Sequence, residues 1–343
     1  MLSILTGAKK NIGDFLIGNR AKQLLSTYVD QEILEIDRFG EIEPYLDQIN
    51  QSKALILCGG PAYTSDFYPS IYQLENLIDK ITVPIIPFGL GWSGSPFHAP
   101  LDFKFTSKSE AFLKRIHSAI KYSSCRDIIT EKILNHQGAH NVLMTGCPVW
   151  YHLPSIEKEY TDLKNVKTIV FSTGAKQVLW WQSIQLLQKI GKLFSDSSII
   201  VSYHRGILPG RNTPLRKGIS YSIIAAFAKL KGFKVIDVSG KLEKIDFYSN
   251  CDLHIGYRVH AHLDFLSRRK PSYLINEDGR GLGMVQSLAL PEFNYDDPAV
   301  QLKLLRQLKI DKADKFIAFQ TTFDKMKKAF ISMKAFLQYL KTL

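Results

Sequence analysis

The sequence contains little cysteine and no long hydrophobic run. Its four cysteines stand far apart and form no Cys-x-x-Cys pair or Cys/His cluster. We therefore expect reduced cysteines in the core and no metal site. No apolar run reaches the roughly 18 residues that a membrane-spanning helix needs, and Lys9 and Lys10 interrupt the apolar start of the chain. These absences predict a cytoplasmic protein without a signal peptide or membrane span.

The common phosphate-binding fingerprints are also missing. No Gly-x-Gly-x-x-Gly opens a helix after the first predicted strand, and no Walker loop is present, which argues against nicotinamide-dependent dehydrogenases and P-loop kinases. Basic residues are spread along the chain without the interleaved aromatic residues of single-strand binders, so we expect no nucleic-acid partner. A catalytically inert scaffold is the alternative outside the enzymes.

Composition is that of an ordinary globular protein with an excess of positive charge. Hydrophobic residues make up 45% and charged residues 22% of the 343 residues. The formal net charge of +12 favours anionic partners such as phosphorylated substrates, anionic lipid headgroups or acidic polysaccharide. The length predicts two domains with a binding cleft between them.

Short apolar runs, many of them ending at glycine, alternate with helical stretches through both halves of the chain. This rhythm predicts Rossmann-like parallel sheets in an α/β protein. We predict a first domain over residues 1–150, a second over 168–290, and a helical segment over 291–343. Residues 148–167 are polar and read as the linker. The predicted strands lie at 2–5, 54–58, 83–88, 122–127, 142–146, 168–172, 198–203, 234–238, 251–255 and 272–275.

Basic residues follow three predicted strands of the second half. Arg258 and His260 come directly after a strand that ends at Gly256, and Arg205 follows the strand over 198–203. Arg280 lies in a predicted loop over 276–281, after the strand over 272–275. Because parallel strands end at one sheet edge, and helix amino termini there favour anions, these side chains should converge on an anion.

Each of these residues also has a structural interpretation. Arg205 would otherwise be a solvated surface arginine, and His260 a histidine satisfied by the core, as we expect for His254 and His262. In the first half, Asn11, Gly13 and Asp14 precede a predicted helix over residues 15–28. Asp14 alternatively only caps that helix, and Gly13 only permits the turn.

The order of several motifs resembles that of the polysaccharide pyruvyl transferase family. Four stretches match: Asn11-Ile12-Gly13-Asp14, Gly59-Gly60, Ser124-Cys125-Arg126-Asp127 followed by Thr145-Gly146-Cys147-Pro148, and Arg258-Val259-His260-Ala261. The resemblance implies two Rossmann-like domains facing across a cleft, as in GT-B glycosyltransferases, with the C-terminal helices packing back. It also implies transfer of a pyruvyl ketal from phosphoenolpyruvate to two hydroxyls of one sugar. The product would belong to an exopolysaccharide, capsule or cell-wall polymer.

The resemblance and the chemistry together suggest roles for these residues. Arg258 and Arg205 would bind the carboxylate and phosphate of the donor with support from Arg280, and His260 would be the general acid or orient the leaving phosphate. Asn11, Gly13, Asp14, Gly59 and Gly60 would contact the acceptor sugar. No cofactor is expected besides phosphoenolpyruvate as co-substrate.

The sequence departs from the family around the donor loop. Arg280 stands where the family often has lysine, and Asn276-Glu277-Asp278 replaces a more usual Tyr-Asp-Pro. A glycosyltransferase that uses a nucleotide sugar is therefore the alternative, since a diphosphate would suit the same basic residues. The acceptor is left open between a lipid-linked, a nucleotide-linked and a polymeric sugar.

The chain ends in one or two long predicted helices over residues 311–343. Phenylalanines gather on one side of them and lysines on the others. One interpretation is a terminal helix packed back across the domains with a solvated lysine face. The other is a basic face that rests on an anionic membrane, which would make the protein peripheral to the inner face of the membrane.

Overall fold

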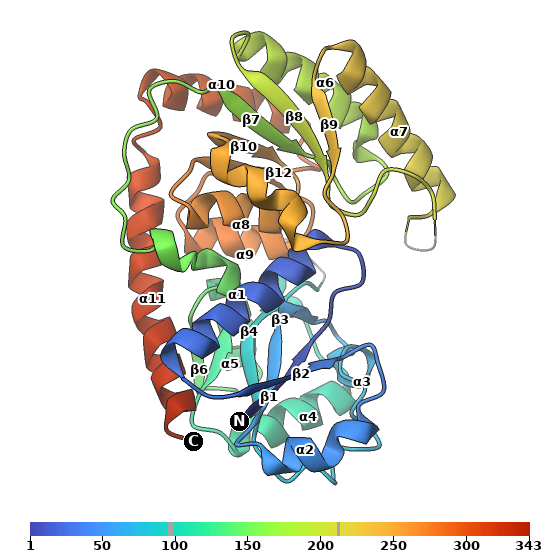
Figure 1. The fold of residues 1–343 in the computed structure, drawn as a ribbon, viewed down its shortest axis with the longest axis vertical. Coiled ribbons are helices and arrows are strands. Elements are labelled where there is room, and N and C mark those ends of the chain that lie inside the picture. Colours follow the sequence, from blue (N-terminus) through green and yellow to red (C-terminus); the bar gives the residue numbers. More distant parts are fainter. Residues whose placement is uncertain (95–98, 211–212) are drawn as a thin grey trace.

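The structure is a computed structural model that describes residues 1–94, 99–210 and 213–343. Two six-stranded sheets, in which neighbouring strands pair in parallel, form two Rossmann-like domains (Figure 1). This confirms the predicted GT-B-like α/β architecture. The central strands are almost continuously apolar because helices cover the faces of such sheets.

The first sheet has the order β2-β1-β3-β4-β5-β6. Its direction of winding reverses between β1 and β3, which makes the carboxyl ends of these two strands the expected ligand-binding place. The strands are β1 (Leu2–Thr6), β2 (Ile33–Asp37), β3 (Leu55–Tyr63), β4 (Ile85–Trp92), β5 (Ser123–Cys125) and β6 (Val142–Met144). The helices are α1 (Ile12–Tyr28), α2 (Leu46–Gln51), α3 (Phe67–Ser70), α4 (Ser107–Ser118) and α5 (Ile128–His136).

The second sheet has the order β12-β11-β10-β7-β8-β9 and reverses between β7 and β10. Its strands are β7 (Thr168–Ser172), β8 (Ser198–Tyr203), β9 (Lys234–Asp237), β10 (Leu253–Gly256), β11 (Ser272–Asn276) and β12 (Phe293–Asn294). Its helices are α6 (Leu179–Leu193), α7 (Leu215–Leu230), α8 (Val259–Ser267) and α9 (Gly279–Ser287), with a 3-10 helix over Leu242–Asn250.

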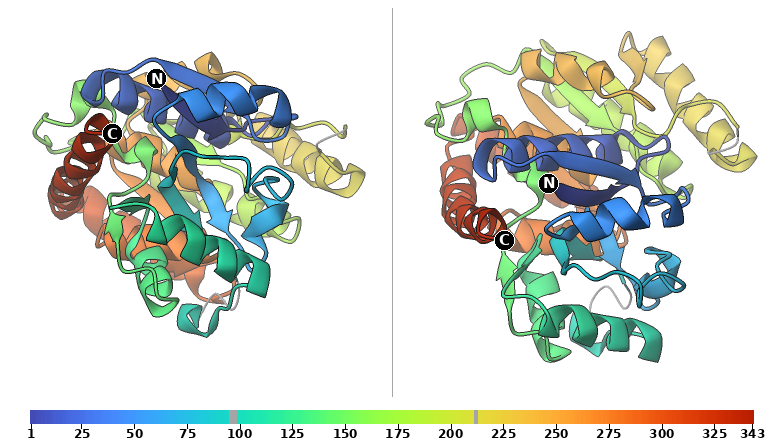
Figure 2. Two further views of the ribbon diagram at one scale, coloured as in Figure 1. Left: turned by 90° about the horizontal axis from the view of Figure 1, so that it is seen from below. Right: turned by 60° about the horizontal axis from the view of Figure 1, so that its bottom comes forward.

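The C-terminal helices join the two domains. Helix α10 (Val300–Ala313) packs on α6, and α11 (Phe319–Lys341) runs back to α1, β5 and β6 of the first domain (Figure 2). The apolar side of α11 is buried, including Phe323, Phe330 and Phe336. The interpretation of a terminal helix packed across the domains is thus confirmed. The segment after residue 290 is not helical throughout, because β12 lies at its start.

Two local predictions were wrong. Gly59 and Gly60 lie inside β3 rather than in a turn after it, because their positive φ angles of 55° and 90° let the strand continue through an irregular register. The predicted loop over 276–281 gives way to α9 after three residues, so Arg280 lies in a helical first turn that Asp278 caps. Residues 148–167 connect β6 of the first sheet to β7 of the second, and Trp150 and Tyr151 near the start of this segment are fully buried.

Within the described ranges, no helix is long and apolar enough to cross a membrane. The same ranges hold no group of three or more His, Cys, Asp or Glu side chains placed to bind a metal ion.

Candidate active site

The turn between β10 and α8 places Arg258 at the point where the second sheet reverses. Gly256 has a φ of 151°, and a Cβ there would lie 2.4 Å from the carbonyl oxygen of Ser172, so only glycine lets β10 approach β7 this closely. The backbone N–H of Arg258 then donates to Oγ of Ser172 at 3.0 Å. These contacts fix the start of α8, whose amino terminus faces the site.

The guanidinium of Arg258 is held from its far side. Nη2 donates to the carbonyl oxygen of Gly174 at 3.3 Å and to the hydroxyl of Tyr221 at 3.1 Å. The side chain is only 7% exposed, and its Nε has no hydrogen-bond partner among the described residues. A buried donor left without a partner is costly, so a bound anion would complete this site.

Arg205 and Arg280 belong to the same cluster. The pKa of Arg205 is lowered by burial and by the charges of Arg258 and Arg280, which places the three guanidinium groups within electrostatic range of one another. Nε of Arg205 is also buried without a partner in the described part of the chain. Arg280 is already paired, because its Nε and Nη2 donate to the carboxylate of Asp278 at 2.9 Å and 2.5 Å. The predicted convergence of the three arginines is therefore present.

His260, in the first turn of α8, reaches across to the first domain. A Cβ on Gly13 would lie 2.4 Å from Nδ1 of His260, so the imidazole rests directly on the glycine. Burial and then the charges of Arg126 and Arg280 lower the pKa of His260 to about 3. The imidazole is consequently neutral at pH 7. Its Nε2 is buried and has no partner within the described ranges.

Asn11 and Asp14 lie at the amino end of α1, as predicted, with Asn11 in the cap position. Burial raises the pKa of the Asp14 carboxyl, while Asn11 and the charges of Arg38, Arg205 and Arg280 oppose that rise. Asp14 of the first domain therefore lies within the field of two arginines of the second. The backbone confirms this docking, since the N–H of Ile12 donates to the carbonyl oxygen of His204 at 3.2 Å.

Two hollows open beside Asp14. A small one is lined by Asp14, Arg38, Gly59 and Gly60, which brings the predicted glycines to the same place. The other, of about 540 Å³, is lined by polar side chains of β1, β2 and α1 and reaches Leu242 of the second domain. The first domain thus offers a polar surface beside the arginines.

Sequence reasoning missed Arg126 as a site residue. It is fully buried, donates from Nη2 to the carbonyl oxygen of Trp92 at 2.7 Å, and pairs with Asp127 at 3.1 Å. Its Nη1 has no partner among the described residues. Gly279 of the second domain packs on the ring of Trp92. A sequence motif does not reveal this packing between the domains. Arg126 nevertheless belongs to the Ser124-Cys125-Arg126-Asp127 motif.

A buried ion pair holds the domains in register. Nη2 of Arg20 on α1 lies 3.2 Å from Oδ1 of Asp264 on α8, and Nε of Arg268 lies 3.0 Å from the other carboxylate oxygen. Both side chains of the Arg20–Asp264 pair are almost inaccessible. Breaking such a pair leaves a buried charge, so it specifies the relative orientation of α1 and α8.

His254 and His262 are fully buried, and Nε2 of His262 has no hydrogen-bond partner among the described residues. Nδ1 of each ring lies within 2.8 Å of Oγ of Ser272, and Nε2 of His254 lies 2.8 Å from Oγ of Ser172. Burial lowers the pKa of His262 to about 3 and that of His254 well below its usual range. This chain of hydrogen bonds supports the Ser172 hydroxyl that holds the turn at Arg258.

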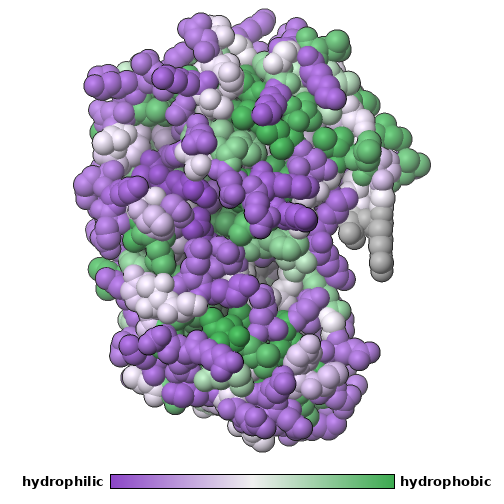
Figure 3. Space-filling model, in the orientation of Figure 1, coloured by the Kyte–Doolittle hydropathy of each residue, from purple (hydrophilic) through white to green (hydrophobic). Residues whose placement is uncertain are grey.

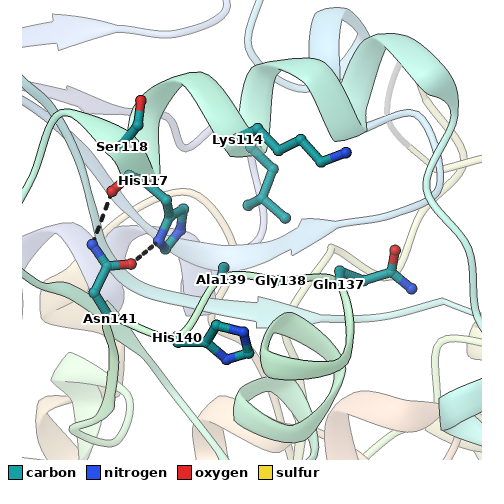
Figure 4. A pocket seen from close by; sticks show the side chains of 9 residues that line it. Lys114, His117, Ser118, Gln137, Gly138, Ala139, His140 and Asn141 are labelled. Carbon is teal, nitrogen blue, oxygen red and sulfur yellow. Dashed lines mark hydrogen bonds between the residues drawn. The ribbon is translucent and has the colours of Figure 1, made fainter.

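A further pocket of about 460 Å³ lies on the first domain between α4 and the turn after α5 (Figure 4). His117 contacts the side chain of Asn141 at 2.6 Å, and Asn141 donates to the carbonyl oxygen of His117 at 2.9 Å. Burial lowers the pKa of His117. Nε2 of His117 has no partner among the described residues, and none of these residues belongs to the arginine cluster.

The family model for polysaccharide pyruvyl transferase matches residues 11–279, which include every strand of the two sheets except β1 and β12 and every residue of the cluster except Arg280. The chain belongs to the polysaccharide pyruvyl transferase family. This family membership makes the protein a transferase of polysaccharide biosynthesis and supports pyruvyl transfer to polysaccharide in general. No curated protein sequence matches the chain.

Solved structures show the same fold at low sequence identity. The UDP-GlcNAc 2-epimerase of Neisseria meningitidis has a TM-score of 0.54 at 8% identity, covering 98% of this chain and 100% of its own. The epimerase of Methanocaldococcus jannaschii, solved with UDP-GlcNAc and UDP, has a TM-score of 0.53 at 13% identity over 91% and 92%. The S. aureus MnaA–UDP structure has a TM-score of 0.53 at 10% identity over 96% and 90%. These likenesses concern the two-domain fold alone.

Proposed function

We propose that the protein transfers a pyruvyl group from phosphoenolpyruvate to a sugar of an exopolysaccharide, capsule or cell-wall polymer or its precursor, and forms a pyruvate ketal. One observation carries this proposal. Arg205, Arg258 and Arg280 of the second domain, with His260, meet Gly13 and Asp14 of the first domain. The proposal places the reaction in the cytoplasm, where phosphoenolpyruvate is made.

The arginines suit the two anionic groups of phosphoenolpyruvate. A guanidinium binds a carboxylate or phosphate through paired charge-assisted hydrogen bonds, and the amino ends of α8 and α9 add to the positive potential. Arg205 and Arg258 each keep a buried Nε without a partner among the described residues, whereas Arg280 is paired with Asp278. We therefore assign the direct contacts to Arg205 and Arg258 and a supporting contact to Arg280.

The reaction has two bond-forming steps. The first sugar hydroxyl adds to C2 of phosphoenolpyruvate and loses its proton, while C3 gains a proton and becomes the methyl group. The second hydroxyl then bonds to C2 and loses its proton as the bond from C2 to the phosphate oxygen breaks. The products are the cyclic ketal and inorganic phosphate.

His260 supplies the proton or orients the leaving phosphate in this scheme. Its pKa of about 3 reflects burial first and then the positive charges of Arg126 and Arg280. A bound multivalent anion would offset these charges, raise the pKa of His260 and favour its imidazolium form. Binding of phosphoenolpyruvate would therefore convert His260 to its protonated form, and the complex would take up a proton from solution.

The acceptor sugar would lie on the first domain. Asp14 accepts hydrogen bonds from sugar hydroxyls in this arrangement, and Asn11 offers an amide beside it. Gly13, Gly59 and Gly60 have no side chains to keep the sugar ring from the donor.

A product assay tests the proposal. The protein is incubated with phosphoenolpyruvate labelled with ¹³C at C3 and a panel of saccharides, and phosphate release and the ketal methyl signal are followed together. We expect both to appear in equal amounts with a suitable sugar. Release of phosphate without a ketal, or absence of any phosphoenolpyruvate binding, would contradict the proposal.

A glycosyltransferase with a nucleotide-sugar donor is the second candidate. A diphosphate suits the same helix amino ends, and structures of similar fold hold UDP or UDP-GlcNAc. Thermal unfolding separates the two, because a ligand that binds the folded state raises the melting temperature. Protection by phosphoenolpyruvate and not by UDP supports pyruvyl transfer, and the reverse supports glycosyl transfer.

A further inference from the structure

Helix α7 exposes an apolar side to solvent. Leu215, Ile219, Ile223 and Leu230 are between 43 and 86% exposed, and their spacing places them within an arc of about 80° on the helix. The opposite side of α7, including Tyr221 and Ile224, is buried. A surface helix normally turns polar residues to water, and a helix that is apolar on both sides is normally buried. The outward side of α7 therefore requires a partner.

Neighbouring segments enlarge this apolar surface. Leu208, in the loop before α7, is 71% exposed, and Trp181 near the amino end of α6 is 54% exposed. Helices α6 and α7 pack side by side, and Figure 3 shows apolar side chains gathered over this part of the surface, at the upper right. Tryptophan is enriched at the boundary between lipid and water. We call the four residues of α7 together with Leu208 and Trp181 the α7 face.

The part of the chain that contains the α7 face is strongly basic. Residues 163–236 contain twelve lysines and arginines and a single acidic residue, Asp196, whereas the whole chain has a net charge of +12. Although basic residues are spread along the chain, acidic residues elsewhere balance them. Arg216 and Lys229 flank the apolar arc of α7 on its two sides, and Asp196 lies in the turn before β8.

We propose that the α7 face docks on an anionic lipid surface. Apolar side chains bordered by basic ones match an interface whose acyl chains lie below negative headgroups. A second copy of this chain would bring the same positive charge to the contact and repel it. The charge therefore favours lipid over self-association, and this proposal does not depend on the identity of the donor.

The docked face would hold the candidate active site beside the membrane. The inner side of α7 carries Tyr221, which accepts a hydrogen bond from Arg258, so the site lies directly behind the docking surface. Such an arrangement gives a lipid-linked acceptor a short path to the site. It also assigns the membrane contact to α7 instead of the lysine face of α11. On α11, the exposed large apolar side chain is Ile331.

Vesicle flotation tests the proposal. The full-length protein is floated with vesicles of phosphatidylcholine alone and with vesicles that also contain phosphatidylglycerol. We expect binding to the anionic vesicles only. Two double variants, L215S/I219S and R216E/K229E, should each weaken this binding by about tenfold or more, because each near-surface charge and each inserted side chain contributes on the order of 1 kcal/mol.

A matched variant on α11 provides the control. Ile331→Ser with Lys328→Glu removes an exposed apolar and a basic residue from the other candidate face, and it should float like the wild type. The four substituted positions on α7, which are Leu215, Arg216, Ile219 and Lys229, are all exposed, so circular dichroism should show unchanged folding. The emission of Trp181 gives a second readout, since a blue shift on vesicle addition should disappear in Trp181→Phe.

Three results would overturn the proposal. The first is equal binding of the wild type and both α7 variants to anionic vesicles, or no binding at all. The second is loss of binding in the α11 variant alone. The third is a wild-type dimer, seen by analytical ultracentrifugation, that L215S/I219S converts to a monomer, because a second copy would then cover the face.

Discussion

The two sheets have similar architecture but carry opposite chemistry at the edges that face each other. The second sheet presents Arg205, Arg258 and Arg280 near helix amino ends, whereas the first presents glycines and the carboxylate of Asp14. Arg258 follows β10, where the second sheet reverses, and Arg205 and Arg280 follow the next strands on either side, β8 and β11. The fold therefore determines where the chemistry takes place. The side chains that follow the strands divide the site into a donor side and an acceptor side.

The first test removes the acid from the donor side. His260→Gln keeps a polar side chain of similar length on Gly13, and we expect kcat to fall by roughly 10² to 10⁴-fold. Phosphoenolpyruvate affinity should change far less. Because His260 is buried, alanine would also lower stability and is a poorer choice. His140→Gln, at an exposed histidine, is the control, and normal turnover in His260→Gln would exclude the residue from the chemistry.

The second test replaces the planar guanidinium of Arg258 on the donor side with an amine that keeps the positive charge. Arg258→Lys cannot reproduce the contacts of Nη2 with Gly174 and Tyr221, and we expect kcat/KM for phosphoenolpyruvate to fall by about 10² to 10³-fold. Steady-state kinetics measure this, with Arg115→Lys on the surface of α4 as the control. Equal kinetics of the two variants would mean that the guanidinium of Arg258 does not bind the donor.

The third test shifts one domain against the other. A Cβ at Gly13 would collide with His260, so Gly13→Ala should displace the imidazole and lower kcat by about 10²-fold. Gly18→Ala lies on the same helix with 3.9 Å to its nearest neighbour and should leave kcat unchanged. If both alanines behave alike, the contact between Gly13 and His260 does not matter for catalysis.

The fourth test uses the buried histidines of the second domain. The unfolded chain protonates His262 below pH 6.5, but the folded chain does so only near pH 3, so folding stability is complete above pH 6.5 and is lost as the pH falls toward 3. At pH 5 the low pKa of His262 in the folded chain lowers the free energy of unfolding by about 2 kcal/mol. Urea unfolding between pH 7 and 5 should show a shallower loss in His262→Asn, and an identical slope would contradict the assignment.

The fifth and smallest test concerns the acceptor side. Asp14→Asn removes a charged hydrogen-bond acceptor, so KM for the sugar should rise about tenfold. Phosphoenolpyruvate should bind as well or better, because the carboxylate near Arg205 no longer competes with it. Asp47→Asn in the first turn of α2 is the control. A loss of phosphoenolpyruvate affinity in Asp14→Asn would contradict the assignment of Asp14 to the acceptor side.

The sequence predicted the parallel strands except β2 and β12, and the convergence of Arg205, Arg258 and His260. These depend on local signals, namely apolar runs ending at glycine and the rule that parallel strands end at one edge. The length of β3 was missed because two glycines with positive φ look like a turn in sequence but continue a strand here. Arg280 was placed in a loop because the capping role of Asp278 is visible only in the fold.

The contacts between domains lay beyond the reach of sequence. Arg126 influences His260, and Gly13 supports it, through packing of residues more than a hundred positions apart. The pKa of His260 follows from that packing and cannot be predicted from the sequence. Likewise, the apolar outward side of α7 becomes recognisable only when the buried side is known.

Isothermal titration calorimetry with phosphoenolpyruvate tests the central claim most directly. We expect the wild type to bind one equivalent with proton uptake near neutral pH, and the affinity to fall by about 100-fold in both Arg205→Gln and Arg258→Lys. Arg115→Lys should bind like the wild type. An absence of binding by the wild type, or equal affinity in all four proteins, would contradict a donor site built from Arg205 and Arg258.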